Sequence, residues 1–197
     1  MAIDISTIAV IGAGDRGREI ASAALLAGYR AILEDVSESR LERAAAIFLR
    51  LGEEACTRLL KASTVEEALR DADLIIEAVA EEMEMKIELF TIFDKFAKPN
   101  AILASSSPAL SIAEMASVTF CAKRCIGMRF SLSAGGKNIL ELVRAPDTSQ
   151  ETVAACSEVG KRMGKEVMVM REIEPRRQDI GATHAMGPGL LPGISQD

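Results

Sequence analysis

The sequence predicts an α/β protein with a Rossmann-type, doubly wound and mostly parallel sheet. Three observations lead to this prediction. Short apolar runs alternate with helical patterns along most of the 197 residues. A Gly-x-Gly-x-x-Gly turn follows the first apolar run, and an acidic residue ends the second. The run at 73–79 is apolar at its centre without alternation, which is typical of a strand buried on both faces.

The first part of the chain is predicted to repeat strand and helix. Strands are expected at 7–11, 30–35, 60–64, 73–79 and 101–107. Helices are expected at 16–28, 37–60, 65–72 and 82–97, the first ending at Gly28 and the last before Pro99.

The later part differs, and it predicts an added C-terminal β-unit. Two strand-like runs, 124–130 and 138–144, are separated by the soft loop SLSAGGK. A helix over 149–164 and a last strand over 165–170 are expected to follow. From Arg171 the periodicity fails. The prediction is therefore a domain of residues 1–172 and an irregular tail of residues 173–197.

Composition argues against two classes of partner and indicates the cellular compartment. The net charge of −6 argues against nucleic acid or an anionic membrane surface. No apolar stretch is long enough to span a bilayer, and an acid stands near the N-terminus where a secretory leader needs positive charge. We therefore expect a cytoplasmic protein without a metal site. Its scattered cysteines are expected to be reduced, although Cys121 and Cys125 could share one helix face.

The glycine turn predicts a dinucleotide site. Gly12 permits the tight turn after the strand, Gly14 lets the backbone approach a diphosphate, and Gly17 lets the helix pack close to the sheet. The helix N-terminus then offers unpaired N–H groups to the anion.

Asp35 is the predicted ligand of the adenosine ribose. A carboxylate there would repel a 2′-phosphate, so NAD is favoured over NADP. Glu34 is expected to face the other side of the strand and ranks second. Arg16 is expected to help neutralise the diphosphate. Asp15 is a like charge beside it and must point away or cap the helix.

Several stretches together resemble the NAD-binding domain of the 3-hydroxyacyl-CoA dehydrogenase family, from about Thr7 to Met170. They are IAVIGAGDRGREIA, GYRAILEDVS, DADLIIEAVAEEMEMKIELF, AILASSSPALSI and CIGMRF…ILELVRAPDTSQETV. The resemblance implies an oxidoreductase that acts on a CH–OH group with NAD in fatty-acid and acyl-CoA metabolism.

The resemblance also assigns the nicotinamide half of the site. Glu81 and Lys86 lie where family members contact that half of the cofactor, although both could be solvated charges on a helix. Ser105 and Ser106 open the loop that in the family lies beside the nicotinamide ribose. Ala78 and Val79, at the end of the strand 73–79, complete the predicted cofactor site.

Departures from the family pattern fall at its catalytic positions. Family members use the histidine of G-x-H-F-F-N-P as general base and orient it with a glutamate twelve residues on. Here the glutamate persists as Glu141, but Arg129 replaces the histidine, and Ser131, Leu132 and Ser133 replace F-N-P. A guanidinium stays protonated near neutral pH and cannot act as a base. We expect Arg129 and Glu141 to form an ion pair instead. The family's substrate-binding serine falls on Pro108, which has no hydroxyl.

Two further differences from the family are expected. The helical hairpin that helps family members hold coenzyme A is cut short between Asp35 and Asp73, and the chain ends at Asp197, before the family's second, all-helical domain could form. The only histidine, His184, lies in the tail, where solvent exposure is expected.

Three functions remain open at this point. The first is an NAD-binding family member with impaired or absent 3-hydroxyacyl-CoA oxidation. The second is an active dehydrogenase on a different hydroxy acid, in which Arg129 clamps a carboxylate or enolate and the base is Glu141, His184 or a partner's residue. The third is a non-catalytic subunit or regulatory nucleotide-binding module. A homodimer or hetero-oligomer is expected to cover apolar surface near the last strands.

Overall fold

The computed structural model describes residues 3–133 and 135–172. Within them, one 8-stranded sheet has the order β3-β2-β1-β4-β5-β6-β7-β8. Its strands are β1 Thr7–Ile11, β2 Arg30–Glu34, β3 Leu59–Ala62, β4 Leu74–Glu77, β5 Ile102–Ser105, β6 Cys125–Leu132, β7 Asn138–Arg144 and β8 Glu166–Arg171. The first six strands pair in parallel, β7 runs antiparallel to β6, and β8 is parallel to β7. The predicted Rossmann-type sheet and its added β-unit are confirmed.

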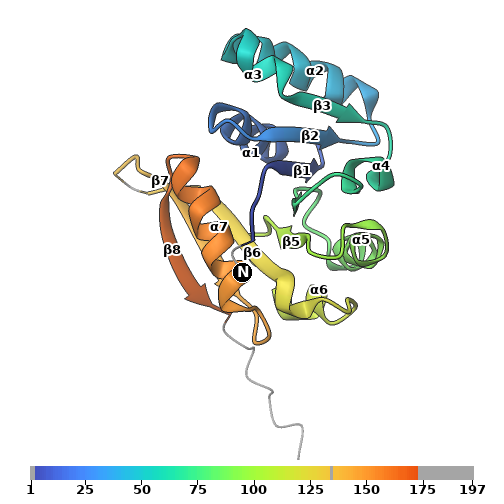
Figure 1. The fold of residues 1–197 in the computed structure, drawn as a ribbon, viewed down its shortest axis with the longest axis vertical. Coiled ribbons are helices and arrows are strands. Elements are labelled where there is room, and N and C mark those ends of the chain that lie inside the picture. Colours follow the sequence, from blue (N-terminus) through green and yellow to red (C-terminus); the bar gives the residue numbers. More distant parts are fainter. Residues whose placement is uncertain (1–2, 134, 173–197) are drawn as a thin grey trace, which may run out of the picture.

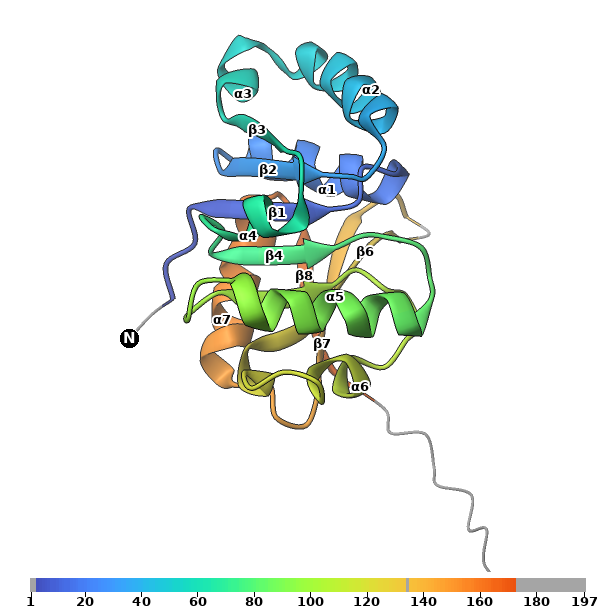
Figure 2. The same ribbon diagram turned by 90° about the vertical axis from the view of Figure 1, so that its right-hand side faces the viewer.

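Helices cover both faces of the sheet (Figures 1 and 2). The α-helices are α1 Asp15–Leu26, α2 Glu38–Phe48, α3 Glu53–Thr57, α4 Val65–Leu69, α5 Met83–Phe96, α6 Ile112–Ala116 and α7 Gln150–Arg162. Short 3-10 helices occupy Leu49–Leu51 and Ala122–Arg124. One core cluster joins the sheet to α1, α2 and α7, and a second joins it to α4, α5 and α6. Figure 2 shows the second layer nearest the viewer, with α5 lying across the sheet.

Strand β4 lies inside the sheet and is buried on both faces. Leu74 and Ile76 pack in the first cluster, while Ile75 packs in the second with Phe90 and Phe93 of α5. This explains its missing alternation, because side chains that point to either face enter an apolar layer.

The stretch 37–60 is largely helical, as predicted, but it is broken near Gly52 and its helical part ends at Thr57. Helix α2 ends at Phe48, and Gly52 has φ +98°, a left-handed conformation that favours glycine and interrupts the helix. Leu59 and Leu60 belong to β3, where they pair with Ala31 and Ile32 of β2. The predicted third strand is thus present, slightly earlier than expected.

The last strand ends one residue later than predicted. Arg171, where the periodicity fails, belongs to β8. The next residue, Glu172, has its carboxylate bonded to the backbone N–H groups of Ile112 and Ala113 at 2.7 and 2.9 Å, at the start of α6. Helix α6 was not among the helices predicted from the sequence. The predicted tail of residues 173–197, with His184, lies outside the described residues.

Two smaller expectations concern the cysteines and the membrane. Cys121 and Cys125 do not share a helix face, because Cys121 precedes the 3-10 turn and Cys125 begins β6. Of the helices in residues 3–133 and 135–172, none is long and apolar enough to cross a membrane.

Candidate functional site

A cleft of about 880 Å³ opens at the carboxyl ends of β1, β2 and β4. Because β2 and β4 lie on opposite sides of β1, the chain order reverses here, and ligands of doubly wound sheets bind at such a point. Most of the predicted cofactor residues line this cleft: Gly12, Gly14, Asp15, Arg16, Asp35, Ala78 and Val79.

Two glycines of the turn lie too close to neighbouring backbone atoms to carry a side chain. Gly12 has φ +106°, and a Cβ there would lie 2.7 Å from the Ala78 carbonyl oxygen. A Cβ on Gly17 would lie 1.8 Å from the Gly12 carbonyl oxygen. Neither position accepts a side chain, so the close packing predicted for these glycines is confirmed.

Gly14 is open where the other two are crowded. A Cβ built on Gly14 meets nothing within 4 Å, and Gly14 is the N-cap of α1 with no side-chain cap. The first N–H groups of α1 therefore face free space, as a bound diphosphate requires. The residues present fit the predicted dinucleotide.

Asp35 is buried and fixed beside this turn. Its Oδ2 accepts a hydrogen bond from the Ala13 backbone N–H at 2.8 Å, and Oδ1 accepts one from the Ser37 N–H at 2.8 Å. The Arg40 guanidinium lies 3.5 Å from Oδ2. The carboxylate is thus preorganised at the cleft wall, where a ribose is expected. Its contact with the ribose stays a prediction.

The two charged residues of the turn point away from its centre. Asp15 is almost fully exposed and pairs with Arg18, whose guanidinium also donates to the Ala13 carbonyl oxygen at 2.8 Å. Asp15 therefore neither plugs the turn nor caps the helix. Arg16 pairs with Glu19 at 3.0 Å on the surface, and its role toward the diphosphate stays a prediction.

Lys86 is a buried charge rather than a solvated one. It is 1% exposed, and its Nζ lies 2.6 Å from Glu77 Oε1 and 3.4 Å from Glu81 Oε2. The other Glu77 oxygen accepts a hydrogen bond from the Ser105 hydroxyl at 2.7 Å, and the Val79 N–H donates to Oε1 at 2.6 Å. The network joins the ends of β4 and β5 to α5, so Lys86 and Ser105 are held rigidly at the predicted nicotinamide side.

The loop after β5 extends this network toward β6. Ser106 is buried, and its N–H donates to the Glu77 carbonyl oxygen at 2.9 Å. The Ser107 hydroxyl donates to Glu81 and accepts a hydrogen bond from the Leu110 N–H at 2.8 Å. Arg129 Nε donates to the Ser107 carbonyl oxygen at 3.0 Å. A chain of polar contacts therefore runs from Glu77 to Arg129.

The predicted ion pair between Arg129 and Glu141 is wrong. The two residues are direct partners in the antiparallel register of β6 and β7. Both lie in the described part of the chain, yet no salt bridge within 4.0 Å joins them. The Arg129 guanidinium instead turns toward the loop that contains Ser107. Pro108, in the same loop, is exposed and offers no hydroxyl.

Sequence reasoning missed four residues of this site. Glu77 and Ser107 organise the polar network, and Arg40 and Arg43 line the cleft beside Asp35. The signal for Glu77 was an acid inside a run of buried strand residues. Arg40 and Arg43 lie one helical turn apart after the predicted ribose ligand. Ser107 had no signal beyond its place in a serine run.

Comparisons with known proteins agree with this architecture. The family model for the 3-hydroxyacyl-CoA dehydrogenase NAD-binding domain matches residues 7–173. A 3-hydroxybutyryl-CoA dehydrogenase from Bradyrhizobium diazoefficiens is 34% identical over 185 residues, which are 87% of this chain and 63% of that protein. The human mitochondrial hydroxyacyl-coenzyme A dehydrogenase is 29% identical and is matched over 58% of its length.

Solved structures of related enzymes share the fold. A 3-hydroxybutyryl-CoA dehydrogenase from Escherichia coli K12 has a TM-score of 0.79 at 29% identity, over 85% of this chain and 38% of that one. A prephenate dehydrogenase from A. aeolicus, at 12% identity and a TM-score of 0.67, shares the fold alone. This chain belongs to the 3-hydroxyacyl-CoA dehydrogenase family and contains the family's NAD-binding domain, with NAD as its cofactor.

Proposed function

We propose that this chain binds NAD and that, acting alone, it oxidises 3-hydroxyacyl-CoA thioesters slowly or not at all. The observation that carries the proposal is Arg129 in the position of the family's general-base histidine, with its guanidinium bonded to the Ser107 carbonyl. Arginine has no lone pair available to take a proton near neutral pH.

The residues divide into those that bind and those that would react. NAD accepts a hydride when bound. The glycine turn and the N-terminus of α1 would hold its diphosphate, Asp35 the adenosine ribose, and Lys86, Glu81 and Ser105 its nicotinamide half. The group missing from this set is a proton acceptor for the substrate hydroxyl.

Two measurements on the 197-residue chain test the proposal. Fluorescence titration with NADH is expected to show saturable binding, weakened at least about tenfold by Asp35→Ala, which removes a hydrogen-bonding charged group. Mixing NAD with 3-hydroxybutyryl-CoA, the substrate class named for the Bradyrhizobium relative, is expected to yield NADH at the background rate. No binding at millimolar NADH would overturn the first half, and brisk turnover would overturn the second.

A second candidate function is a dehydrogenase for a different hydroxy acid. It is favoured by the Arg129 guanidinium, whose two terminal amino groups bond none of the residues in the described ranges. Such a fork suits a carboxylate, which it can bind through two parallel hydrogen bonds. A panel of free hydroxy acids, assayed for NADH production, tests this candidate. Silence across the panel argues against it.

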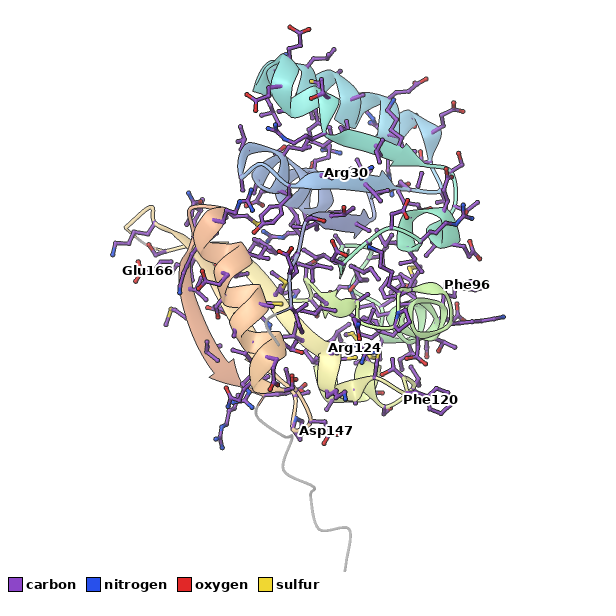
Figure 3. The ribbon with its side chains drawn as sticks, in the orientation of Figure 1. Arg30, Phe96, Phe120, Arg124, Asp147 and Glu166 are labelled. Atoms are coloured by element: carbon purple, nitrogen blue, oxygen red, sulfur yellow. The ribbon has the colours of Figure 1, made fainter. Side chains whose placement is uncertain are left out.

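A third candidate is a non-catalytic subunit or nucleotide-binding module of an assembly, and a homodimer is the assembly we propose. It is supported by three consecutive apolar residues on the edge strand β8, Met168, Val169 and Met170, whose side chains are 46%, 52% and 36% exposed. In Figure 3, Glu166 marks this edge of the sheet, and the exposed Phe96 and Phe120 lie on the opposite side, near α5 and α6. Light scattering after size exclusion tests this assembly, and a monomer at micromolar concentration would contradict it.

Two further expectations belong to this proposal. Residues 1–172 act as the NAD-binding domain, and the protein works in the cytoplasm. Limited proteolysis in the presence of NADH tests the first by mapping the protected fragment, and cell fractionation tests the second.

A further inference from the structure

Glu34, the last residue of β2, is a buried carboxyl group at the cleft wall. It is 3% exposed and lines the same cleft as Gly12, Asp35 and Val79. Neither of its carboxyl oxygens bonds any residue that the structure describes, whereas the adjacent Asp35 carboxylate has three partners. Within the described residues, the only buried side-chain nitrogen or oxygen atom without a partner is Arg58 Nε. The unbonded Glu34 oxygens therefore reach the cleft, where a ligand can supply their hydrogen-bond partner.

The cause of the burial is the position of Glu34 in the sheet. Ile32, two residues earlier, packs with the α4 and α5 layer, whereas Leu33 packs with the α1 and α2 layer. Glu34 therefore faces the α4 and α5 side, opposite to Asp35, as the sequence predicted. Burial, with the nearby carboxylates of Asp35 and Glu66, raises the pKa of Glu34 from 4.5 to about 7.

Apolar side chains line the same cleft as Glu34. They are Val36, which follows β2 and is 96% exposed, and Val79, Ala80 and Leu89. Apolar walls of this kind fit the faces of an aromatic base, and a few polar groups at the edge then fix which base is accepted. A nucleotide whose ribose is bonded to Asp35 carries its base in this part of the cleft.

We propose that Glu34 selects adenine by accepting a hydrogen bond from its exocyclic amino group. A carboxyl oxygen accepts such a bond whether or not the group is protonated. Hypoxanthine carries a carbonyl oxygen in place of that amine. The ionised carboxylate can only accept, so above pH 7 two acceptors would face each other, whereas the protonated form could donate to that oxygen. A site built to bond a polar group rejects an analogue that lacks it, because the buried group loses its partner. The inference rests on NAD binding and assigns the adenine end of that site.

The test compares two reduced dinucleotides that differ at this group alone. At pH 8.5, where Glu34 is ionised, the full chain is titrated with NADH and with reduced nicotinamide hypoxanthine dinucleotide, each followed by its own fluorescence. We expect NADH to bind at least about tenfold more tightly, the magnitude typical of one hydrogen bond to a carboxyl group. Equal dissociation constants would overturn the proposal while leaving NAD binding intact. Failure of both ligands to bind would instead overturn the cofactor site itself.

Two variants and one control sharpen the test. Glu34→Gln keeps the shape but adds a donor that suits hypoxanthine, so the ratio of dissociation constants is expected to fall to about threefold or less. Glu34→Val removes both kinds of bond, and the expected ratio is near one. The matched control is Glu88→Gln, an exposed carboxylate that lines the same cleft, for which the ratio stays at the wild-type value. A ratio unchanged by Glu34→Val in a chain with normal thermal unfolding would sink the assignment.

Discussion

Two regions of the sheet differ in the functional groups that they carry. Where β1, β2 and β4 end, the structure places each group that a dinucleotide needs: a tight glycine turn, an open helix N-terminus and a fixed carboxylate. In the loop after β5 and within β6, Pro108 and Arg129 occupy positions where the family resemblance implies a serine and a histidine. Cofactor binding depends largely on backbone shape, whereas proton transfer depends on single side chains. A Rossmann-type domain can therefore bind a dinucleotide whether or not it carries a proton acceptor.

The two regions are joined by the polar chain from Glu77 through Lys86, Glu81 and Ser107 to Arg129. A substitution in this link tests the comparison most severely, because Glu77 and Lys86 at its start are buried charges that depend on each other.

Breaking the link at Lys86 is expected to have the largest effect. Lys86→Met leaves the fully buried Glu77 carboxylate without its counter-ion, which costs about 3–5 kcal/mol of unfolding free energy. Urea unfolding measures the loss. The double variant Lys86→Met with Glu77→Gln removes both charges and is expected to recover at least half of it. A single variant as stable as the wild type would contradict the buried pair.

Restoring the base tests the weaker end of the comparison. Arg129→His with Pro108→Ser returns two family groups beside Glu141. We expect the rate of NAD reduction by 3-hydroxybutyryl-CoA to rise about 100-fold, a usual contribution of a general base. The rise should follow a group with a pKa near ~6.5, and Arg129→Lys is the control that should show none. If the double variant binds NADH and still gives only the background rate, loss of the base is not what limits this end.

The pH dependence of stability sharpens the comparison at the cofactor end. Folding raises the pKa of Glu34 from 4.5 to about 7, so the folded chain holds this proton more tightly than the unfolded chain. The contribution of Glu34 to the free energy of unfolding is fully present below pH 4.5 and is lost as the pH rises through 7. Glu34→Gln cannot ionise, so it should be more stable than the wild type at pH 8 by about 2 kcal/mol, and nearly equal to it at pH 5. Thermal unfolding of the NAD-free chain at the two pH values measures the difference. A pH-independent gap would assign it to packing instead.

The smallest effect is expected at the open glycine. A Cβ on Gly14 meets no protein atom within 4 Å, so Gly14→Ala should leave the melting temperature unchanged. The methyl group would occupy space that a diphosphate needs, and we expect NADH affinity to fall about tenfold, equal to about 1.4 kcal/mol. Gly52→Ala is the contrasting control, since Gly52 lies away from the cleft at φ +98° and should lose stability without losing affinity per folded molecule. Undiminished affinity in Gly14→Ala would place the diphosphate elsewhere.

The parts of the fold that were predictable are those fixed by local sterics and burial. A side chain at Gly12 would clash with Ala78, and one at Gly17 would clash with the turn itself. The spacing of these glycines in the sequence was enough to predict the turn. The buried strand β4 was equally clear. Gly52 was visible in the sequence, but nothing local shows that it adopts a left-handed conformation, and the helix was therefore extended too far.

The part of the site that was predictable is the part formed by the backbone. The partners of Lys86 come from three separate segments, so its burial could not be deduced from a helical pattern. The Arg129–Glu141 spacing correctly predicted cross-strand neighbours, but the orientation of the guanidinium was set by Ser107, which lies on a different strand end. The direction of a side chain in a polar network depends on every member of that network. The spacing of two residues in the sequence gives information on that pair alone.

Glu172 has a practical consequence for anyone who shortens this chain. A cut after Met170, where the last strand was expected to end, would fall two residues short of the predicted domain end at residue 172. That cut would remove the carboxylate that holds the first two amides of α6, whose Ile112 packs against Gly127 and Val143. A fragment ending two residues too early should thus lose rigidity in the neighbourhood of the serine loop, and would be mistaken for evidence that the domain cannot stand alone.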